Sequence, residues 1–169
     1  MVFRYYRIVP NSLNRMPIMP ITIASLTQLK TMLNQEVAVS DWVQVTQERI
    51  NLFAQATGDH QWIHVDVERA KTSPFKSTIA HGFLTLSLVP ELSANAMVMP
   101  SVKMGVNYGL NKVRFTNPVP AGARVRGRFT LTEVQDIAGG AQVTMTCKIE
   151  IEGQEKPACV AESISRRFE

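Results

Sequence analysis

The segment ATGDHQWIHVD, residues 56–66, places an aspartate, Asp59, five positions before a histidine, His64. A carboxylate and an imidazole that share one water molecule can take a proton from it and return one, which is general acid–base chemistry. On an α-helix these two side chains would point about 140° apart, and on a strand an odd separation puts them on opposite faces. They converge only in an irregular loop, which Gly58 would allow.

The same spacing also fits a purely structural role, in which Asp59 caps a turn and His64 packs against the core. A second segment, IAHGFLTLSL at residues 79–88, bears on this choice because Gly82 stands at the expected start of an apolar helix. The first amides of a helix lack internal partners and carry the positive end of its dipole. A glycine there could admit a substrate oxygen, as in an oxyanion hole, or could simply permit close helix packing. His81 could line the site or serve the structure.

The elements that must position these residues follow from periodicity and capping signals. A weak helical pattern covers residues 22–34, and residues 40–46 are expected to form a short strand. A helix is predicted from Gln47, with Thr46 as its cap and Gly58 just past its end.

Two further helical segments are expected before the chain changes character. A short helical turn covers Val67–Lys71, and a long apolar helix spans about residues 81–95, with a kink or an end at Pro90. The apolar run that contains this helix is interrupted by polar residues, which favours a buried helix over a membrane span.

The second half of the chain alternates between apolar and polar residues, as a sheet with one wet face does. Strands are predicted across residues 103–115, 124–134, 142–152 and 157–166, with hairpin turns at Gly139-Gly140 and Gly153-Gln154. The residues predicted to face inward are Val125, Phe129, Leu131, Val143, Met145, Cys147, Ile149 and Ile151. Helices first and an antiparallel meander second indicate an α+β fold, with the helix near 81–95 covering the apolar face.

Composition limits the class of protein. The chain has 169 residues, 45% of them hydrophobic and 19% charged, which suits one globular domain. The net charge of +4 is too small to indicate nucleic acid by itself. There is no metal-ligand or phosphate-loop spacing, and Cys147 and Cys159 form no recognisable framework, so reduced thiols in a cytoplasm are expected. Residues 1–20 are expected to be a peripheral or disordered extension and residues 21–169 the domain.

Several blocks of this sequence resemble a known family. The runs FAQATGDHQWIHVDVERA (53–70) and TIAHGFLTLSL (78–88) resemble the MaoC-type dehydratases, which include (R)-specific enoyl-CoA hydratases with a hot dog fold. The blocks SDW, NYGLNKVRF and KPACVAES are similar to its nodulation-protein-N-like branch. Together the blocks extend from Ser40 to Ser163.

The resemblance implies a curved antiparallel sheet wrapped around one central helix, and a homodimer with active sites near the subunit interface. It assigns the catalytic pair to Asp59 and His64, which would activate the water that adds to a trans-2-enoyl thioester. It assigns the carbonyl-binding amide to Gly82, with Gln61 and His81 beside the substrate. No metal or organic cofactor is implied, and the substrate is an acyl-CoA or an acyl carrier protein thioester.

Two positions depart from the family pattern, which commonly reads Asp-x-Asn-Pro-aliphatic-His. Gln61 stands in place of the asparagine and Trp62 in place of the proline. The acid–base pair is intact, so the departure bears on acyl-chain preference and rate more than on the type of reaction.

A basic rim would help to bind the phosphates of coenzyme A, and the candidates are Lys112, Arg114, Arg124, Arg126 and Arg128. Because Arg124, Arg126 and Arg128 share one strand face, an ordinary solvated face is the favoured explanation for each of them. Two other functions fit a hot dog domain: an acyl-CoA thioesterase, which would need a carboxylate on the central helix where only Glu91 is available, and a non-catalytic acyl-thioester-binding protein.

Overall fold

The protein is described by a computed structural model that covers residues 19–169. The expected N-terminal extension, residues 1–20, therefore falls almost entirely outside the described residues. Within residues 19–169, no helix is both long and apolar enough to cross a lipid bilayer.

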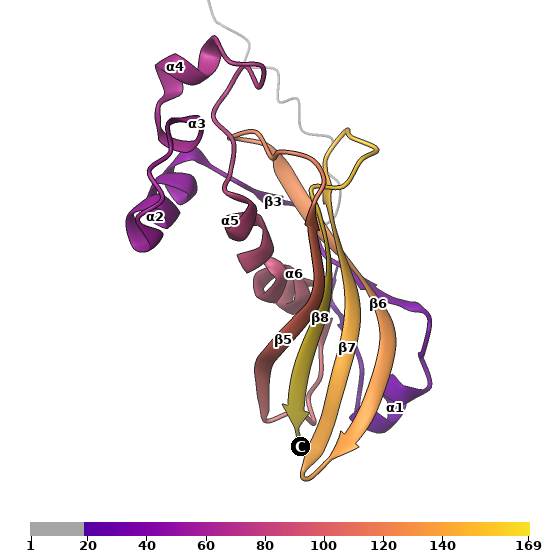
Figure 1. The fold of residues 1–169 in the computed structure, drawn as a ribbon. Helices are drawn as coiled ribbons and strands as arrows, with labels where there is room; N and C mark the ends of the chain where they lie inside the picture. Colours follow the sequence, from indigo (N-terminus) through magenta and orange to yellow (C-terminus); the bar gives the residue numbers. More distant parts are fainter. Residues whose placement is uncertain (1–18) are drawn as a thin grey trace, which may run out of the picture.

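The sheet is antiparallel and curved, and its long strands come from the second half of the chain (Figure 1). Its strands are β2 (Glu36–Val39), β3 (Val43–Gln44), β5 (Met104–Phe115), β6 (Arg124–Ile137), β7 (Gly140–Ile151) and β8 (Cys159–Phe168). The order is β2-β6-β7-β8-β5, with β3 also paired to β6. Gly139 and Gly153 have φ of 75° at the two hairpin turns, as the sequence predicted.

The central helix lies against the concave face of this sheet, so the predicted hot dog arrangement is confirmed (Figure 1). It consists of α5 (Gly82–Ser87) and α6 (Val89–Ala96), which meet at Leu88, close to the predicted interruption at Pro90. Leu84, Leu88 and Leu92 are buried at helical spacing. They pack into one core with the residues predicted to face inward, all eight of which are buried. The short strands β1 (Ile21–Thr22) and β4 (Met97–Val98) pair in parallel beside it.

The remaining helices all precede the central helix in the chain, and they include the segment around Asp59 and His64. They are α1 (Leu26–Lys30), α2 (Gln47–Thr57), α3 (Trp62–Val65) and α4 (Val67–Lys71). Helix α2 begins and ends as predicted: the Thr46 hydroxyl accepts from the N–H of Arg49, and Gly58 follows with φ of 76°. The predicted turn Val67–Lys71 is confirmed as α4.

Two expectations for the first half were too long, and the short strands β1 and β2 were missed. The helix expected over residues 22–34 is only α1, because Ser25 caps its start and Asn34, with φ of 61°, lies beyond its end. The strand expected over residues 40–46 is only β3. Ser40 still bonds to Gly127 of β6, but the Asp41 carboxylate accepts from the N–H of Trp42 and turns the chain between them. Strand β2 was not predicted, since it is short and its register with β6 is irregular.

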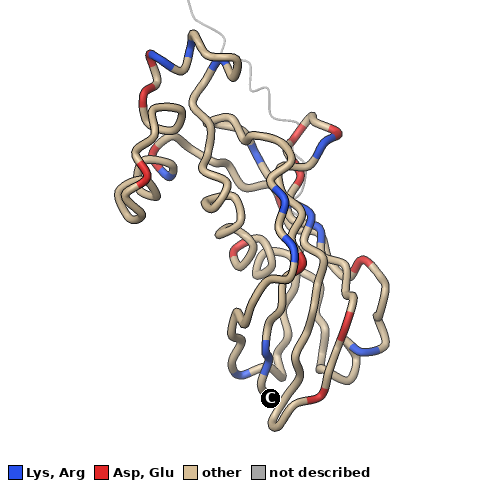
Figure 2. The backbone as a smooth tube through the Cα atoms, viewed as in Figure 1, with Lys and Arg blue, Asp and Glu red and all other residues tan. Residues whose placement is uncertain are grey.

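Ion pairs line the outer face of the sheet, where positive and negative positions lie side by side (Figure 2). Arg124 pairs with Glu152 at 3.2 Å and Arg126 with Glu150 at 2.8 Å. Arg128 pairs with Glu36 at 2.6 Å, which ties β6 to β2. These pairs are the solvated sheet face that the alternation predicted.

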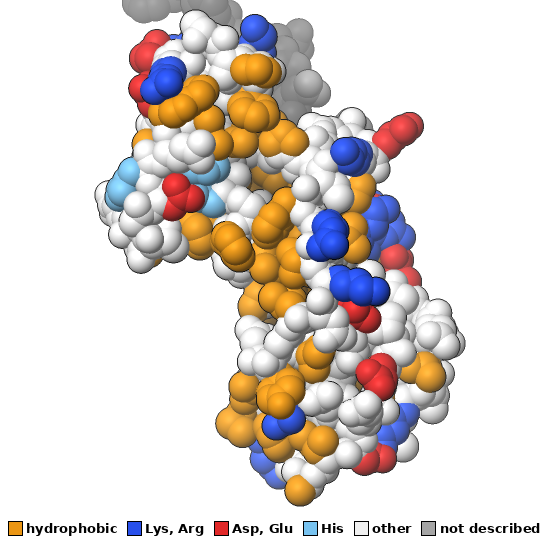
Figure 3. All heavy atoms as spheres, viewed as in Figure 1, with side chains coloured by type: hydrophobic (Ala, Val, Ile, Leu, Met, Phe, Trp, Pro, Cys, Tyr) orange, Lys and Arg blue, Asp and Glu red, His pale blue; other side chains and the backbone are white. Residues whose placement is uncertain are grey.

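The edge strand β5 leaves apolar side chains uncovered. Met104, Val106, Tyr108, Leu110 and Phe115 are all exposed, although they belong to a twelve-residue strand. Figure 3 shows apolar side chains gathered on the side of the molecule where β5 and α5 run. A long apolar edge strand of this kind is a template for pairing with another chain.

We expect Gly58→Ala to lower the free energy of unfolding by about 1 kcal/mol, because a Cβ at a left-handed φ is strained. No atom lies within 4 Å of the position of that Cβ, so the effect should come from the backbone alone. Gly105→Ala is the control, since that site is also open and has no positive φ. Chemical denaturation measures both. Equal stability of Gly58→Ala and the wild type would contradict the requirement for glycine at the exit of α2.

Candidate active site

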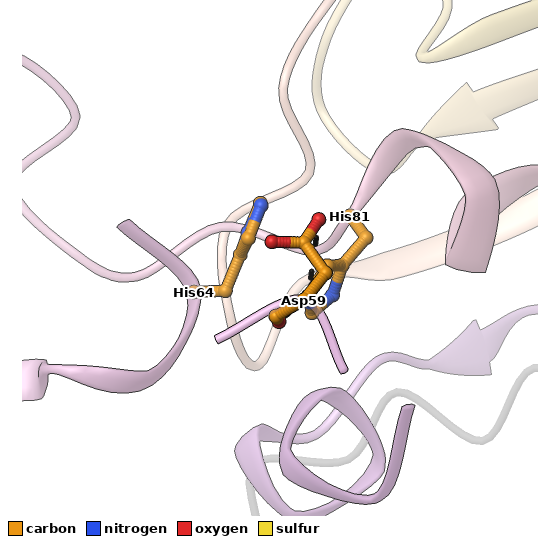
Figure 4. Close-up of side chains that lie close together, drawn as sticks. All are labelled: Asp59, His64 and His81. Atoms are coloured by element: carbon orange, nitrogen blue, oxygen red, sulfur yellow. Dashed lines mark hydrogen bonds and ion pairs between the residues drawn. The ribbon is translucent and has the colours of Figure 1, made fainter. Parts of the chain in front are cut away.

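Three side chains from different elements meet at one place (Figure 4). Asp59 follows α2, His64 belongs to α3, and His81 immediately precedes α5. The two imidazoles are buried, with 6% and 3% of His64 and His81 exposed, whereas the side chain of Asp59 is 53% exposed. The site is therefore a pair of buried rings with a solvent-facing carboxylate beside them.

The orientation of His64 is set by a main-chain carbonyl. Its Nδ1 lies 2.7 Å from the oxygen of Ile79, and since a carbonyl only accepts, Nδ1–H is the donor. In the neutral ring, Nε2 is then the nitrogen with a free lone pair. The N–H of Ile79 donates in turn to the oxygen of Ile63 at 3.0 Å, so α3 and the segment before α5 hold each other. His64 thus presents a basic nitrogen of fixed identity.

His81 connects the backbone of Asp59 to the ring of His64. Its Nε2 donates to the Asp59 carbonyl oxygen at 2.9 Å and lies 4.0 Å from the carboxylate oxygen Oδ2. The ring stacks on His64 with 3.7 Å between centroids and packs 5.0 Å from Phe53. His81, for which the sequence left a lining role and a structural role open, therefore holds the two candidate catalytic residues together.

The loop that brings Asp59 and His64 together is shorter than expected. Only residues 59–61 are irregular, and Trp62 begins the helical turn α3 that carries His64. Asp59 Oδ1 also accepts from the N–H of Gln61 at 3.3 Å, so the carboxylate supports its own turn. Asp59 therefore does cap a turn and His64 does pack in the core, and the two side chains nevertheless converge.

Gln47 is a positioning residue that the sequence did not single out. Its side-chain amide donates to the carbonyl oxygen of His64 at 2.8 Å, and its side-chain oxygen accepts from the hydroxyl of Thr78. It thereby ties the start of α2 to α3 and to the strand-like segment before α5. In the sequence Gln47 was only the first residue of a helix, and no local signal marked this contact.

Gly82 occupies the first position of α5, where its N–H has no partner within the helix. No hydrogen bond from this N–H is made within residues 19–169. A Cβ at this position would lie 2.9 Å from the ring of Phe115, which itself packs edge-on against Phe83. Close packing against Phe115 therefore requires a glycine at position 82, and within the described residues the N–H of Gly82 is free to bind a ligand oxygen.

The electrostatics of the pair favour a neutral imidazole. Burial lowers the pKa of His64 below its ordinary value, and the nearby ring of His81 acts in the same direction. The hydrogen bond to Ile79 and the charge of Asp59 oppose this shift without reversing it. At neutral pH, His64 is therefore ready to accept a proton rather than to donate one.

The cluster is poorly arranged for a metal ion. Asp59, His64 and His81 can offer ligand atoms that lie within 4.8 Å of one another. The two rings are stacked with only 26° between their planes, so one ion cannot lie close to the planes of both. Metal ligation would require the rings to turn.

The other predicted site residues lie around the rim. Gln61 is exposed and its side chain makes no hydrogen bond within residues 19–169. Trp62 lies beneath the guanidinium of Arg69, 4.2 Å from its ring centroid. Lys112 and Arg114 lie near the end of β5 and have no carboxylate partner in the described part of the chain, unlike Arg124 and Arg126. Phe115 faces the helix, so Arg114 points to the opposite side of the sheet.

Glu91 is the acid on the central helix that a thioesterase would need. Its carboxylate is paired with Arg49 of α2 at 3.1 Å. This pair links α6 to α2, and Glu91 is not a member of the Asp59–His64–His81 cluster.

Comparison with known proteins gives consistent results. The family model described as "MaoC like domain" matches residues 28–153. The chain is 54% identical over 146 residues to 3-hydroxyacyl-thioester dehydratase Z of Mycobacterium tuberculosis, covering 86% of this chain and 97% of that protein. It is 47% identical to nodulation protein N of Rhizobium leguminosarum bv. viciae, covering 83% and 89%. The fold is similar to the R-hydratase PhaJ1 of Pseudomonas aeruginosa, with a TM-score of 0.65, 24% identity and coverage of 81% and 82%.

The imidazole of His64 should titrate below the ordinary histidine pKa of about 6.5. The unfolded chain then binds the proton first as the pH falls, so His64 reduces stability in the window below that value. Nitrogen-detected NMR of the histidine rings measures the midpoint, and His64→Gln identifies the signal by its loss. A midpoint above the ordinary value would contradict the conclusion that burial dominates the titration of this ring.

Proposed function

The chain belongs to the MaoC-like domain family, and from that premise we propose that it catalyses the reversible, (R)-specific hydration of trans-2-enoyl-CoA to (R)-3-hydroxyacyl-CoA. Its relatives in that family support a hydro-lyase. The trans-2-enoyl-CoA substrate and the catalytic roles of Asp59 and His64 are our proposal. The observation that carries it is the convergence of Asp59 with a His64 ring whose Nε2 is free.

The proton transfers can be assigned to this pair. A water molecule held between the Asp59 carboxylate and His64 Nε2 loses a proton as its oxygen bonds to C3 of the enoyl thioester. The electrons of the double bond move towards the thioester oxygen, and a proton is returned to C2. Because the same two groups hold the water and the proton, both are added from one side of the substrate. The reverse sequence removes water from a 3-hydroxyacyl thioester.

The negative charge that develops on the thioester oxygen needs a donor. We assign this role to the N–H of Gly82, which is unpaired within the described residues and carries the positive end of α5. The Phe115 ring packed against Gly82 excludes a side chain from that position. His81 holds the geometry through its contacts with Asp59 and His64.

The remaining parts of the substrate would meet the rim. Lys112 is our candidate for the phosphates of coenzyme A, because Arg124 and Arg126 are already paired with carboxylates and Arg114 points to the side of the sheet opposite the helix. Gln61 and Trp62, where the chain leaves the commoner family pattern, are our candidates for tuning rate and chain preference. The location proposed is the cytoplasm, supported by Cys147 and Cys159, which are buried, free thiols.

We also propose that the chain forms a homodimer through β5. This strand pairs with β8 on one side only and exposes apolar side chains along its length. Antiparallel pairing of two β5 strands about a two-fold axis would extend the sheet and cover those side chains. Such a dimer would place a second copy beside Phe83 and Phe115, close to the site.

Asp59→Asn and His64→Gln should each lower kcat/KM for crotonyl-CoA hydration by at least about 100-fold, because each removes one half of the proton-transfer pair. Loss of enoyl-thioester absorbance measures the rate, and circular dichroism checks folding. His60→Gln is the matched control, since His60 is exposed and outside the cluster. Near-normal rates in both variants would refute the assigned pair, and release of free CoA thiol without hydration would favour a thioesterase.

Val106→Lys should convert the homodimer into a monomer, because it places a charge on the apolar edge of β5. Val98→Lys is the control: Val98 is 42% exposed and Val106 43%, but Val98 belongs to β4. Light scattering after size exclusion measures the mass of each. A wild-type mass of one chain, or a Val106→Lys dimer, would remove β5 as the interface.

A further inference from the structure

The inner face of β8 changes from apolar to polar along its length. Cys159 and Ala161 are buried, and Ser163, Ser165 and Arg167 continue the same face. Their partners across the sheet on β7 are the buried residues Met145, Val143 and Ala141, which confirms that all three polar side chains point towards the helix side. A cavity of about 460 Å³ lies there, between α6 and the ends of β5 and β8.

Arg167 enters this cavity without a counter-ion. No carboxylate lies within ion-pair distance of its guanidinium in residues 19–169, and residues 1–18 contain no aspartate or glutamate. Among the described residues its side chain donates only to the sulfur of Met99, which is a weak acceptor. Loss of hydration lowers the pKa of Arg167, although a guanidinium stays charged. A partly buried cation in this state is costly unless an anion reaches it.

Other polar groups share the cavity and lack partners. Ser163 and Ser165 of β8 and Ser93 of α6 line it, and none of their hydroxyls makes a hydrogen bond within the described residues. The amide of Asn107 on β5 is also unpaired there. Hydroxyl and amide donors around one guanidinium are the groups that bind a carboxylate.

The cavity continues towards the candidate active site. A second cavity of about 290 Å³ shares Val89, Pro90, Asn107 and Ser163 with the first and reaches Leu86 and Leu110. Leu86 lies one helical turn beyond Gly82. The two cavities therefore form one groove, whose apolar end lies one helical turn from Gly82 and whose other end is lined by Arg167.

The length of this groove sets the size of the occupant. Eleven helical positions separate Gly82 from Ser93, which at ~1.5 Å per residue is about 16 Å. An extended chain covers about 3.6 Å per three bonds, so roughly thirteen bonds span that distance. A fourteen-carbon acyl chain bound at Gly82 would therefore reach the level of Ser93, which lines the same cavity as Arg167.

We propose that this cavity binds the far end of the acyl chain and selects acyl groups that end in a carboxylate, held by Arg167 and the neighbouring serines. This inference rests on the proposed function, which places the thioester at Gly82. A methyl end would leave the guanidinium unpaired, whereas a carboxylate neutralises it. The selected substrates are thus ω-carboxyacyl thioesters.

Binding of tetradecanedioyl-CoA and tetradecanoyl-CoA, which differ only in the terminal carboxylate, tests this directly by calorimetry. Neither can be hydrated, so binding is measured apart from turnover. We expect the wild type to bind the carboxylate form about 10- to 100-fold more tightly, as a charged hydrogen-bonded pair allows. Arg167→Met should abolish the preference and Arg167→Lys keep part of it. Arg166→Met is the control, because Arg166 lies on the outer face over Tyr108.

Two outcomes would overturn the proposal. The wild type could bind both thioesters equally, or tetradecanoyl-CoA more tightly, a result that needs no variant to fold. Arg167→Met could keep the preference; if it also halved the mass of the particle, the cation would be assigned to a carboxylate of a second copy. Crotonyl-CoA hydration by the wild type, measured alongside, shows separately whether the proposed function holds.

Discussion

The hydrogen bond from His64 Nδ1 to the carbonyl oxygen of Ile79 fixes which ring nitrogen can act as a base. The surrounding contacts keep the His64 ring in the orientation that this hydrogen bond requires. Ile79 is held by Ile63, and Gln47 holds both the backbone of His64 and the side chain of Thr78. Burial then keeps the imidazole neutral, since it lowers the pKa of His64. A side chain that could pack as an ordinary core residue is thereby turned into an oriented proton acceptor.

The fold separates this chemistry from the groove beside the central helix. Asp59, His64 and His81 come from turns and short helices outside the sheet, which place them at the start of α5. The sheet contributes Phe115, which packs against Gly82, and farther along it contributes the polar inner face of β8. Because α5 and α6 meet at Leu88 beside this groove, one broken helix borders both the reacting end and the far end of the proposed acyl site.

Much of this arrangement was predictable from the sequence because its signals are local. Alternation predicted the strands near residues 124–134 and 142–152, Thr46 and Gly58 predicted the ends of α2, and Pro90 predicted the interruption that the central helix has at Leu88. The exact loop that joins Asp59 to His64 was not predictable, because Trp62–Val65 is a single helical turn held by contacts distant in sequence. The roles of Gln47 and Arg167 depend on which segments meet across the core. From residue type alone, Gln47 is an ordinary helix start and Arg167 an ordinary charged residue at the end of a strand, so neither role could be predicted.

We propose above all that this protein adds water to an enoyl thioester with one stereochemical outcome. The most direct test is to incubate the protein with crotonyl-CoA in heavy-oxygen water and to determine the configuration and the position of the label in the product. We expect (R)-3-hydroxybutyryl-CoA with the heavy oxygen in its hydroxyl group. The (S) product, or heavy oxygen in a released carboxylate together with free CoA, would contradict the claim.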